Sequence, residues 1–165
     1  RAVDKLGDIS HLAVNGYYQS VWQYIFFATP DSELFTNREW VGTYCQNGRI
    51  TYDAPVRLDA RLGSRVAADL DAIRRVFTNY SGKRNADPQG VLPYWIFAVD
   101  TLYHAARKLM VFCWDGHKSA ASRRALKKDM NALLGRFETL WRDRNRPSEI
   151  RITRKRYQKV MRSLD

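Results

Sequence analysis

Three long segments of the chain carry apolar residues at every third or fourth position. They span about residues 57–80, 92–113 and 119–141, and short polar stretches separate them. This spacing lines one face of an α-helix with apolar side chains, and helices joined by short loops pack antiparallel. The pattern therefore predicts a mostly α fold: an antiparallel helical bundle of about five to six helices, forming a single helical domain over residues 1–165.

Shorter helices are expected on both sides of these three segments. The sequence predicts two of them near the N-terminus, over about residues 3–14 and 17–28, and a last one over about residues 153–164. Thr153 is expected to cap the last helix, because a threonine hydroxyl accepts hydrogen bonds from the free N–H groups of a first helical turn. The two N-terminal helices and the last one are expected to cover the three long ones.

The segment over residues 40–53 is the least helical part of the chain. Two runs rich in β-prone residues flank Asn47-Gly48. An Asn-Gly pair between such runs is a signal for a two-residue hairpin turn, because both of its positions readily adopt positive φ. The sequence thus predicts either a small β-hairpin near residues 40–53 or an irregular excursion, and it does not decide between the two. An isolated hairpin is only marginally stable, so it is expected to pack on the helices.

The predicted helix over residues 17–28 is apolar on nearly all sides. A helix of this kind is buried or covered by another surface. If the chain is part of a larger assembly, an exposed apolar face here is the expected docking surface for the partner. The candidate docking face consists of Tyr17, Val21, Trp22, Ile25 and Phe26.

Basic residues are concentrated in the last third of the chain. The formal net charge is +11, but residues 1–116 carry 13 Lys and Arg against 12 Asp and Glu, whereas residues 117–165 carry 15 against 5. A basic block of this kind is typical of a surface for nucleic acid or another anion, of a docking face for an acidic partner domain, or of a solvated helix face. The candidate anionic-partner face consists of Arg123, Arg124, Lys127, Lys128, Arg151, Arg154, Lys155, Arg156, Lys159 and Arg162.

No pattern in the sequence predicts a catalytic, cofactor-binding or metal site. His11, His104 and His117 lack the spacing of metal-ligand motifs, and there is no glycine-rich phosphate loop. Asp100 lies one helical turn before His104 on a largely apolar helix, so its carboxylate is a candidate to orient that ring. The alternatives are a buried structural histidine and an ion pair of Asp100 with Arg107 or with a neighbouring helix.

Two further features restrict the class of protein. Cys45 and Cys113 could pair with each other, but two cysteines make no disulfide framework, and we expect free thiols that are buried or half-buried. Charged residues interrupt the longest apolar run, residues 91–114, so that no run approaches the roughly 18 residues of a membrane-spanning helix. The sequence therefore predicts no membrane span.

Short motifs at three places resemble one known family. Residues 137–150 read FETLWRDRNRPSEI, residues 98–107 read AVDTLYHAAR, and residues 6–9 read LGDI. Together they resemble the C-terminal helical region of bacterial β-N-acetylhexosaminidases of glycoside hydrolase family 20, in which a final long helix ends in a Leu-Trp-x-x-Arg-Asn-Arg-Pro segment. The order of elements agrees over nearly the whole chain, although the specific motifs cover only a small part of it.

The resemblance implies an accessory helical domain without its catalytic barrel. The family hydrolyses terminal N-acetylhexosamines with an adjacent Asp-Glu pair on a (β/α)₈ barrel, whereas this chain contains no Asp-Glu dipeptide and lacks strand–helix alternation. Asp100, His104 and Arg107 match a pattern of the family but are not its catalytic groups. The first functional hypothesis is therefore a non-catalytic C-terminal domain that packs on a catalytic barrel and has no cofactor of its own.

Two other hypotheses follow from the residues themselves. One is a basic helical protein that binds or packages nucleic acid, such as a filament or capsid subunit, which uses the cationic face over residues 119–164 and covers residues 17–28 by self-association. The other is an enzyme with a site built around Asp100 and His104. Four tryptophans are candidates for stacking on sugars in the first hypothesis and for core packing otherwise. They are Trp22, Trp40, Trp95 and Trp114.

Overall fold

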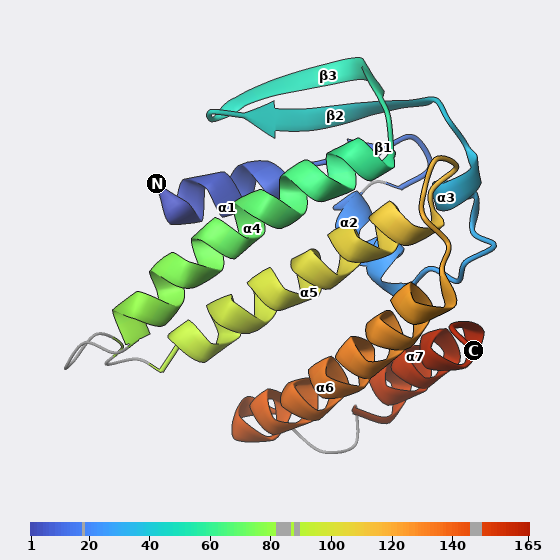
Figure 1. The fold of residues 1–165 in the computed structure, drawn as a ribbon. Helices are drawn as coiled ribbons and strands as arrows, with labels where there is room; N and C mark the ends of the chain where they lie inside the picture. The colour runs from blue at the N-terminus through green and yellow to red at the C-terminus, as the bar shows by residue number, and fades with distance from the viewer. Residues whose placement is uncertain (18, 82–86, 88–89, 146–149) are drawn as a thin grey trace.

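The computed structural model describes the chain except for residues 18, 82–86, 88–89 and 146–149. The described part is mostly helical, with seven α-helices and one three-stranded antiparallel sheet of order β1-β2-β3 (Figure 1). The prediction of a mostly α fold is confirmed. The elements are α1 (Ala2–Ser10), β1 (Ala13–Val14), α2 (Val21–Phe27), α3 (Glu33–Thr36), β2 (Trp40–Gln46), β3 (Arg49–Val56), α4 (Ala60–Ser81), α5 (Leu92–Phe112), α6 (Ala120–Arg144) and α7 (Ile150–Ser163).

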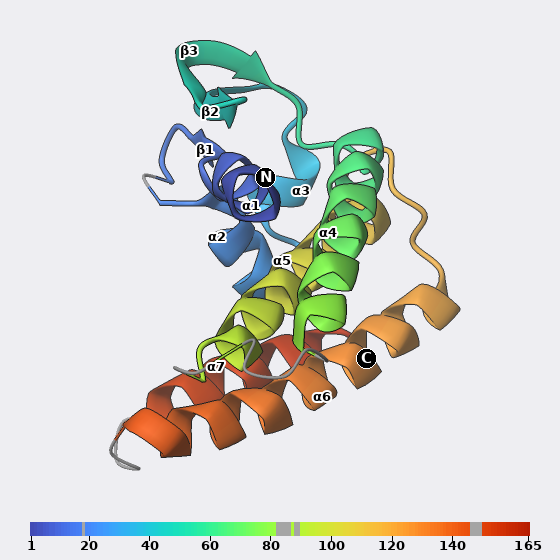
Figure 2. The ribbon, with the colours of Figure 1, turned by 90° about the vertical axis from the view of Figure 1, so that its left-hand side faces the viewer.

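Helices α4 and α5 lie side by side at the centre of the molecule (Figure 1). Gly63 of α4 permits this approach, because a Cβ there would lie 2.8 Å from the carbonyl oxygen of Ala106 and 2.8 Å from the Cγ of Met110 on α5. On its other side α5 packs against α6, and α6 packs against α7. Figure 2 shows that the hairpin of β2 and β3 and the pair of α6 and α7 lie at opposite ends of the molecule.

The predicted docking face belongs to the chain's own core, and that prediction is wrong. Its members Val21, Trp22, Ile25 and Phe26 have exposed fractions of 0%, 1%, 0% and 5%. These four side chains of α2 face the rest of the chain, including α5 and α7, and the ring of Phe26 lies 5.4 Å from that of Tyr157 on α7. Tyr17 precedes the helix, is half-buried, and donates its hydroxyl to Glu33 at 3.0 Å. Neither a partner nor self-association is needed to cover α2.

The ends of the short elements differ from the sequence prediction. The helix predicted over residues 3–14 ends at Ser10, because Ala13–Val14 pairs with β2. The helix predicted over residues 17–28 begins only at Val21. Thr153 is not a cap, because α7 already begins at Ile150, one turn earlier. The single turn of α3 was not predicted from the sequence.

The β-hairpin near residues 40–53 is confirmed. Asn47 and Gly48 have φ values of 52° and 74°, as a two-residue turn between twisted strands requires. Asp53 has a φ of 49° and lies where the register shifts, so the outer strand β3 contains a bulge. Asp8 of α1 holds the turn in place, because its carboxylate accepts the N–H groups of Asn47 at 2.7 Å and Gly48 at 3.2 Å.

Candidate functional site

Charged side chains of α4, α5 and α6 meet around Asp100, one of the sequence-predicted site residues. Its carboxylate accepts a hydrogen bond from Arg74 of α4 at 2.7 Å and another from Arg136 of α6. Asp100 therefore makes the predicted ion pair with neighbouring helices, and Arg107 is not its partner. The side chain of Asp100 is only 13% exposed, so its carboxylate would be an unpaired buried charge without the two arginines.

His104 is oriented by Asp129 of α6, and the prediction that Asp100 orients it is wrong. The Nδ1 of His104 lies 2.7 Å from the Oδ2 of Asp129, while Arg107 approaches the same oxygen at 3.5 Å. Burial lowers the pKa of His104, and the hydrogen bond with Asp129 opposes this only in part. The imidazole is therefore neutral at pH 7 and donates its Nδ1–H.

The geometry around His104 is that of a structural residue. Its Nε2 is buried without a hydrogen-bond partner, and the ring packs at 5.3 Å from that of Phe26. An imidazole with a free Nε2 lone pair has the form of a general base, but a base must reach its substrate. The side chain has an exposed fraction of 0%, so no substrate reaches it in this fold. The interpretation as a buried structural histidine accounts for these contacts.

A small pocket of about 270 Å³ adjoins this charged cluster. Burial alone raises the pKa of Asp129, but the hydrogen bond from His104 and the positive charge of Arg107 outweigh it, so the pKa lies below its usual value. Asp100 and Asp129 make ion pairs between helices that tie α4, α5 and α6 together, whereas Asp71 pairs with Arg75 on its own helix. The pocket is lined by Asp71, Arg74, Asp100, Tyr103, Asp129, Ala132, Leu133 and Arg136.

We expect Asp129→Asn to lower the free energy of unfolding by about 1–2 kcal/mol at pH 7, because it weakens a charged hydrogen bond to a buried group. The folded-state pKa of Asp129 is depressed, so its stabilisation is present above the unfolded pKa and is lost as pH falls through the folded value. The difference from wild type should therefore shrink below about pH 4. Urea unfolding at several pH values measures it, with exposed Asp143→Asn on the same helix as the control.

Lys108 is a buried charged residue that sequence reasoning missed. It has an exposed fraction of 0%, and its Nζ donates to the carbonyl oxygens of Phe26 at 2.9 Å and Ala28 at 2.6 Å. These carbonyls lie at the C-terminus of α2, where the helix dipole favours a positively charged donor. Burial lowers the pKa of Lys108 to about 7. A sequence signal was present, because Lys108 follows His104 by one turn on a helix that is apolar on most sides.

A larger cleft of about 830 Å³ lies between α1, the hairpin and α4. Its polar lining includes Asp8 and Cys45, whose Sγ donates to the Oδ1 of Asp8 at 3.0 Å. This hydrogen bond raises the pKa of the Cys45 thiol, and burial raises that of Cys113 to about 12. Both cysteines are free, as predicted, and both are held as thiols rather than as nucleophilic thiolates.

The predicted anionic-partner face divides into paired and unpaired cations. Four of its members are engaged, and among them Arg154 contacts Glu138 at 2.6 Å, Lys127 contacts Asp165, and the guanidinium of Arg123 lies over the ring of Phe112. Arg156 likewise lies over the ring of Phe27, with its outer side in solvent. The structure shows no ion pair within its described part for the remaining members. These are Arg124, Lys128, Arg151, Lys155, Lys159 and Arg162.

The four candidate tryptophans differ in burial and in the groups that they contact. Trp22 is 1% exposed and donates its Nε1–H to the carbonyl of Ile9 at 2.9 Å, so it is a core residue. Trp40 and Trp114 are half-buried, and Arg38 lies over the ring of Trp114. Trp95 is 42% exposed and packs on Phe77.

Three further findings concern metal binding, membrane spans and related proteins. Within the residues that the structure describes, no group of three or more His, Cys, Asp or Glu side chains has the arrangement of a metal site. None of the helices described has both the length and the apolar character needed to cross a bilayer. Comparison with models of known protein families, with curated proteins and with solved structures found no match.

Proposed function

We propose that this chain is a non-catalytic helical accessory domain of a β-N-acetylhexosaminidase-type glycoside hydrolase, and that it packs on the catalytic barrel through its β-hairpin. The observation that carries the proposal is an uncovered apolar surface on β2 and β3. Val41, Ile50 and Tyr52 have exposed fractions of 43%, 46% and 69%. Exposed apolar surface that is gathered at one place is typical of a protein interface.

The strand register places these three side chains on one face of the hairpin, with Ile50 and Tyr52 two residues apart and Val41 farther along, beside Pro55. Ile50 pairs with Cys45, and strand alternation puts Val41 and Tyr52 on the same face as that pair. Trp40 and Val56 pair on the opposite face, and Val56 is buried. The hairpin therefore covers the chain's own core with one face and leaves Val41, Ile50 and Tyr52, here called the hairpin patch, on the other.

The residues that carry the family resemblance have roles that suit an accessory domain. Asp100, His104 and Arg107 hold α5 to its neighbours through ion pairs and a hydrogen bond, as described above. In this proposal α4, α5, α6 and α7 act as an antiparallel bundle that supports the hairpin, and the bundle makes no contact with the reacting sugar. The resemblance segment over residues 137–150 ends α6, with residues 146–149 outside the described part.

The experiment is reconstitution with a β-N-acetylhexosaminidase barrel expressed without its C-terminal helical region. We expect the chain to bind this barrel in analytical ultracentrifugation and to raise its melting temperature. The double variant Ile50→Glu/Tyr52→Glu should weaken binding by about 30-fold or more, because charges then enter an apolar contact at the centre of the interface. Ile152→Glu is the matched control, since Ile152 is 71% exposed and lies on α7, far from the hairpin (Figure 2).

Two results would contradict the proposal. One is the absence of a complex, or a complex that the double variant and Ile152→Glu weaken equally. The other is hydrolysis of a chromogenic N-acetylhexosaminide by the chain alone that is abolished by Asp100→Asn, because the chain would then be an enzyme with its site near Asp100. Circular dichroism of each variant shows whether the fold is retained.

A further inference from the structure

Helix α7 carries cations on its outer side and no anions. Its fourteen residues include six Lys and Arg and neither Asp nor Glu. Ile150, Tyr157 and Val160 are buried and fix the helix on the core, whereas Arg151, Lys155 and Arg162 are exposed. Helical periodicity puts these three cations on one line of about 16 Å along the helix. Lys159 lies beside that line and is exposed as well.

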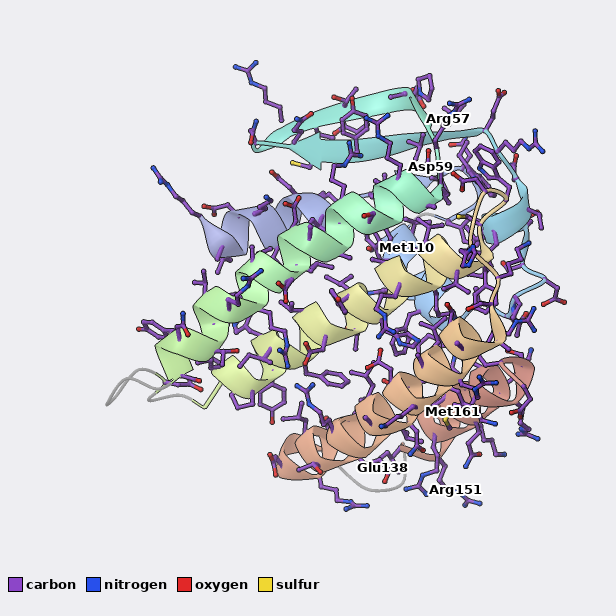
Figure 3. All side chains as sticks on the ribbon, viewed as in Figure 1. Arg57, Asp59, Met110, Glu138, Arg151 and Met161 are labelled. Carbon is purple, nitrogen blue, oxygen red and sulfur yellow. The ribbon has the colours of Figure 1, made fainter. Side chains whose placement is uncertain are left out.

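Within the described part of the chain, none of these four cations makes an ion pair, although Lys159 lies close enough to Asp31 to lower the pKa of that carboxyl. Among the residues that the structure describes, Glu138 and Asp165 at the α6–α7 pair contact other cations, namely Arg154, Arg142 and Lys127. Arg162 makes only a hydrogen bond within its own helix, to the carbonyl oxygen of Gln158 at 3.3 Å. Figure 3 shows Arg151 at the end of the molecule opposite to Arg57, next to the solvent side of α6 and α7. An unneutralised cationic line attracts an extended polyanion.

We propose that the line formed by Arg151, Lys155, Lys159 and Arg162 binds the sugar-phosphate backbone of a nucleic acid duplex, without reading its sequence. Charge complementarity carries the inference. Half of these residues are arginines, whose planar guanidinium forms paired hydrogen bonds with phosphate oxygens. This activity goes beyond the accessory-domain function and does not depend on it, because the line lies on α7 and the hairpin patch lies at the other end of the molecule (Figure 2).

The aromatic residues of this region favour a duplex over a single strand. Proteins that bind single strands stack exposed bases on exposed aromatic rings. In the described parts of α6 and α7, Phe137 and Trp141 are half-buried and Tyr157 is buried, and these rings pack on one another. The surface thus offers cations for phosphates and no ring for a base. Contacts of this kind position a protein on nucleic acid without specifying sequence.

The proposal predicts strongly salt-dependent binding to a duplex of random sequence. If the four cations each neutralise one phosphate, counterion release gives a slope of about −3.6 in the logarithm of affinity against the logarithm of salt. Affinity should then fall by about 10²-fold between 50 and 200 mM salt. Fluorescence anisotropy of a labelled duplex, with the unmodified full chain as titrant, measures this slope.

The triple variant Arg151→Gln/Lys155→Gln/Arg162→Gln tests whether the line is the site. We expect it to weaken duplex binding by about 10²-fold at 50 mM salt and to reduce the salt slope by about 3, close to one per phosphate contact removed. The matched control is Arg57→Gln/Arg61→Gln/Arg65→Gln, which removes the same charge from exposed residues before and within the first turns of α4. The control should change the affinity for the duplex by less than about threefold, because salt screens the interaction of phosphates with charges that lie far from the binding site.

Three results would overturn the proposal. They are no duplex binding at 50 mM salt, equal weakening by the two triple variants, and tighter binding of an acidic peptide or a single strand than of the duplex at equal charge. Equal weakening would mean that the net charge of +11, rather than α7, attracts nucleic acid. All six substituted side chains are exposed, so both variants should fold, and their thermal unfolding checks this. Failure here leaves the reconstitution with a hexosaminidase barrel unaffected.

Discussion

Lys108→Met should lower the free energy of unfolding by about 3 kcal/mol at pH 8, although methionine fills nearly the same space. The variant removes the ammonium or amine that donates to the carbonyls of Phe26 and Ala28 at the end of α2, and no other donor to them is found among the described residues. A buried carbonyl without a partner costs about 1–3 kcal/mol, and two are affected. Chemical unfolding monitored by circular dichroism measures the loss. Lys128→Met, on the exposed face of α6, is the control and should change stability by less than about 0.5 kcal/mol.

The same substitution should remove a pH dependence of folding. The Nζ of Lys108 donates two hydrogen bonds, one to each carbonyl. When Lys108 is protonated, its third N–H has no partner in the described part of the chain. Burial lowers the folded pKa from 10.5 to about 7, so between these values the unfolded chain binds more protons and stability rises with pH. From pH 7 to 9 the wild type should gain about 2 kcal/mol from this group. A pH dependence that is identical in Lys108→Met would contradict this role.

Gly63→Ala and Gly135→Ala should change stability in opposite directions. At Gly63 a new Cβ would lie 2.8 Å from a backbone oxygen of α5, which cannot move without separating α4 from α5. Overpacking of this kind costs about 3 kcal/mol. Gly135 lies within α6 and is exposed, and a Cβ there meets nothing within 4 Å. Because alanine favours the helix, Gly135→Ala should stabilise the protein by about 0.5–1 kcal/mol.

Thermal melts of the two alanine variants test the α4–α5 contact directly. Gly63→Ala should melt well below wild type, and Gly135→Ala slightly above it. If Gly63→Ala were as stable as wild type, the two helices would not approach as closely at this point as the structure shows. Gly63→Ser should be destabilised as well, because serine places a Cβ at the same position. Destabilisation of both variants would show that the effect is steric and not specific to alanine.

The long helices were predictable because each buries a single continuous face. Along α4, Val66, Leu70, Ile73 and Phe77 are buried at spacings of three and four, and no other structure has this period. The hairpin was predictable from Asn47-Gly48, because few other residue pairs accept two consecutive positive φ values. In both cases a local pattern is sufficient to determine the element.

The errors arose where burial depends on contacts distant in sequence. Helix α2 reads as an uncovered apolar helix, because α5 and α7, which pack against it, follow it by about 70 residues or more in the chain. The partner of His104 was predicted to be Asp100 on the same helix, whereas Asp129 on α6 makes the contact. The paired carbonyls of Lys108 also lie 80 and 82 residues away. Periodicity within one helix carries no information about which neighbour packs on it.

The two thiols differ in how deeply the fold buries them. Cys45 is half-buried in the hairpin, where Asp8 of α1 holds both its Sγ and the adjoining turn. Cys113 is fully buried at the end of α5, beside the central contact with α4. Local opening of a peripheral unit requires less free energy than unfolding of the core. The chain therefore contains one natural reporter for detachment of the hairpin and α1, and a second for global unfolding, without any introduced label.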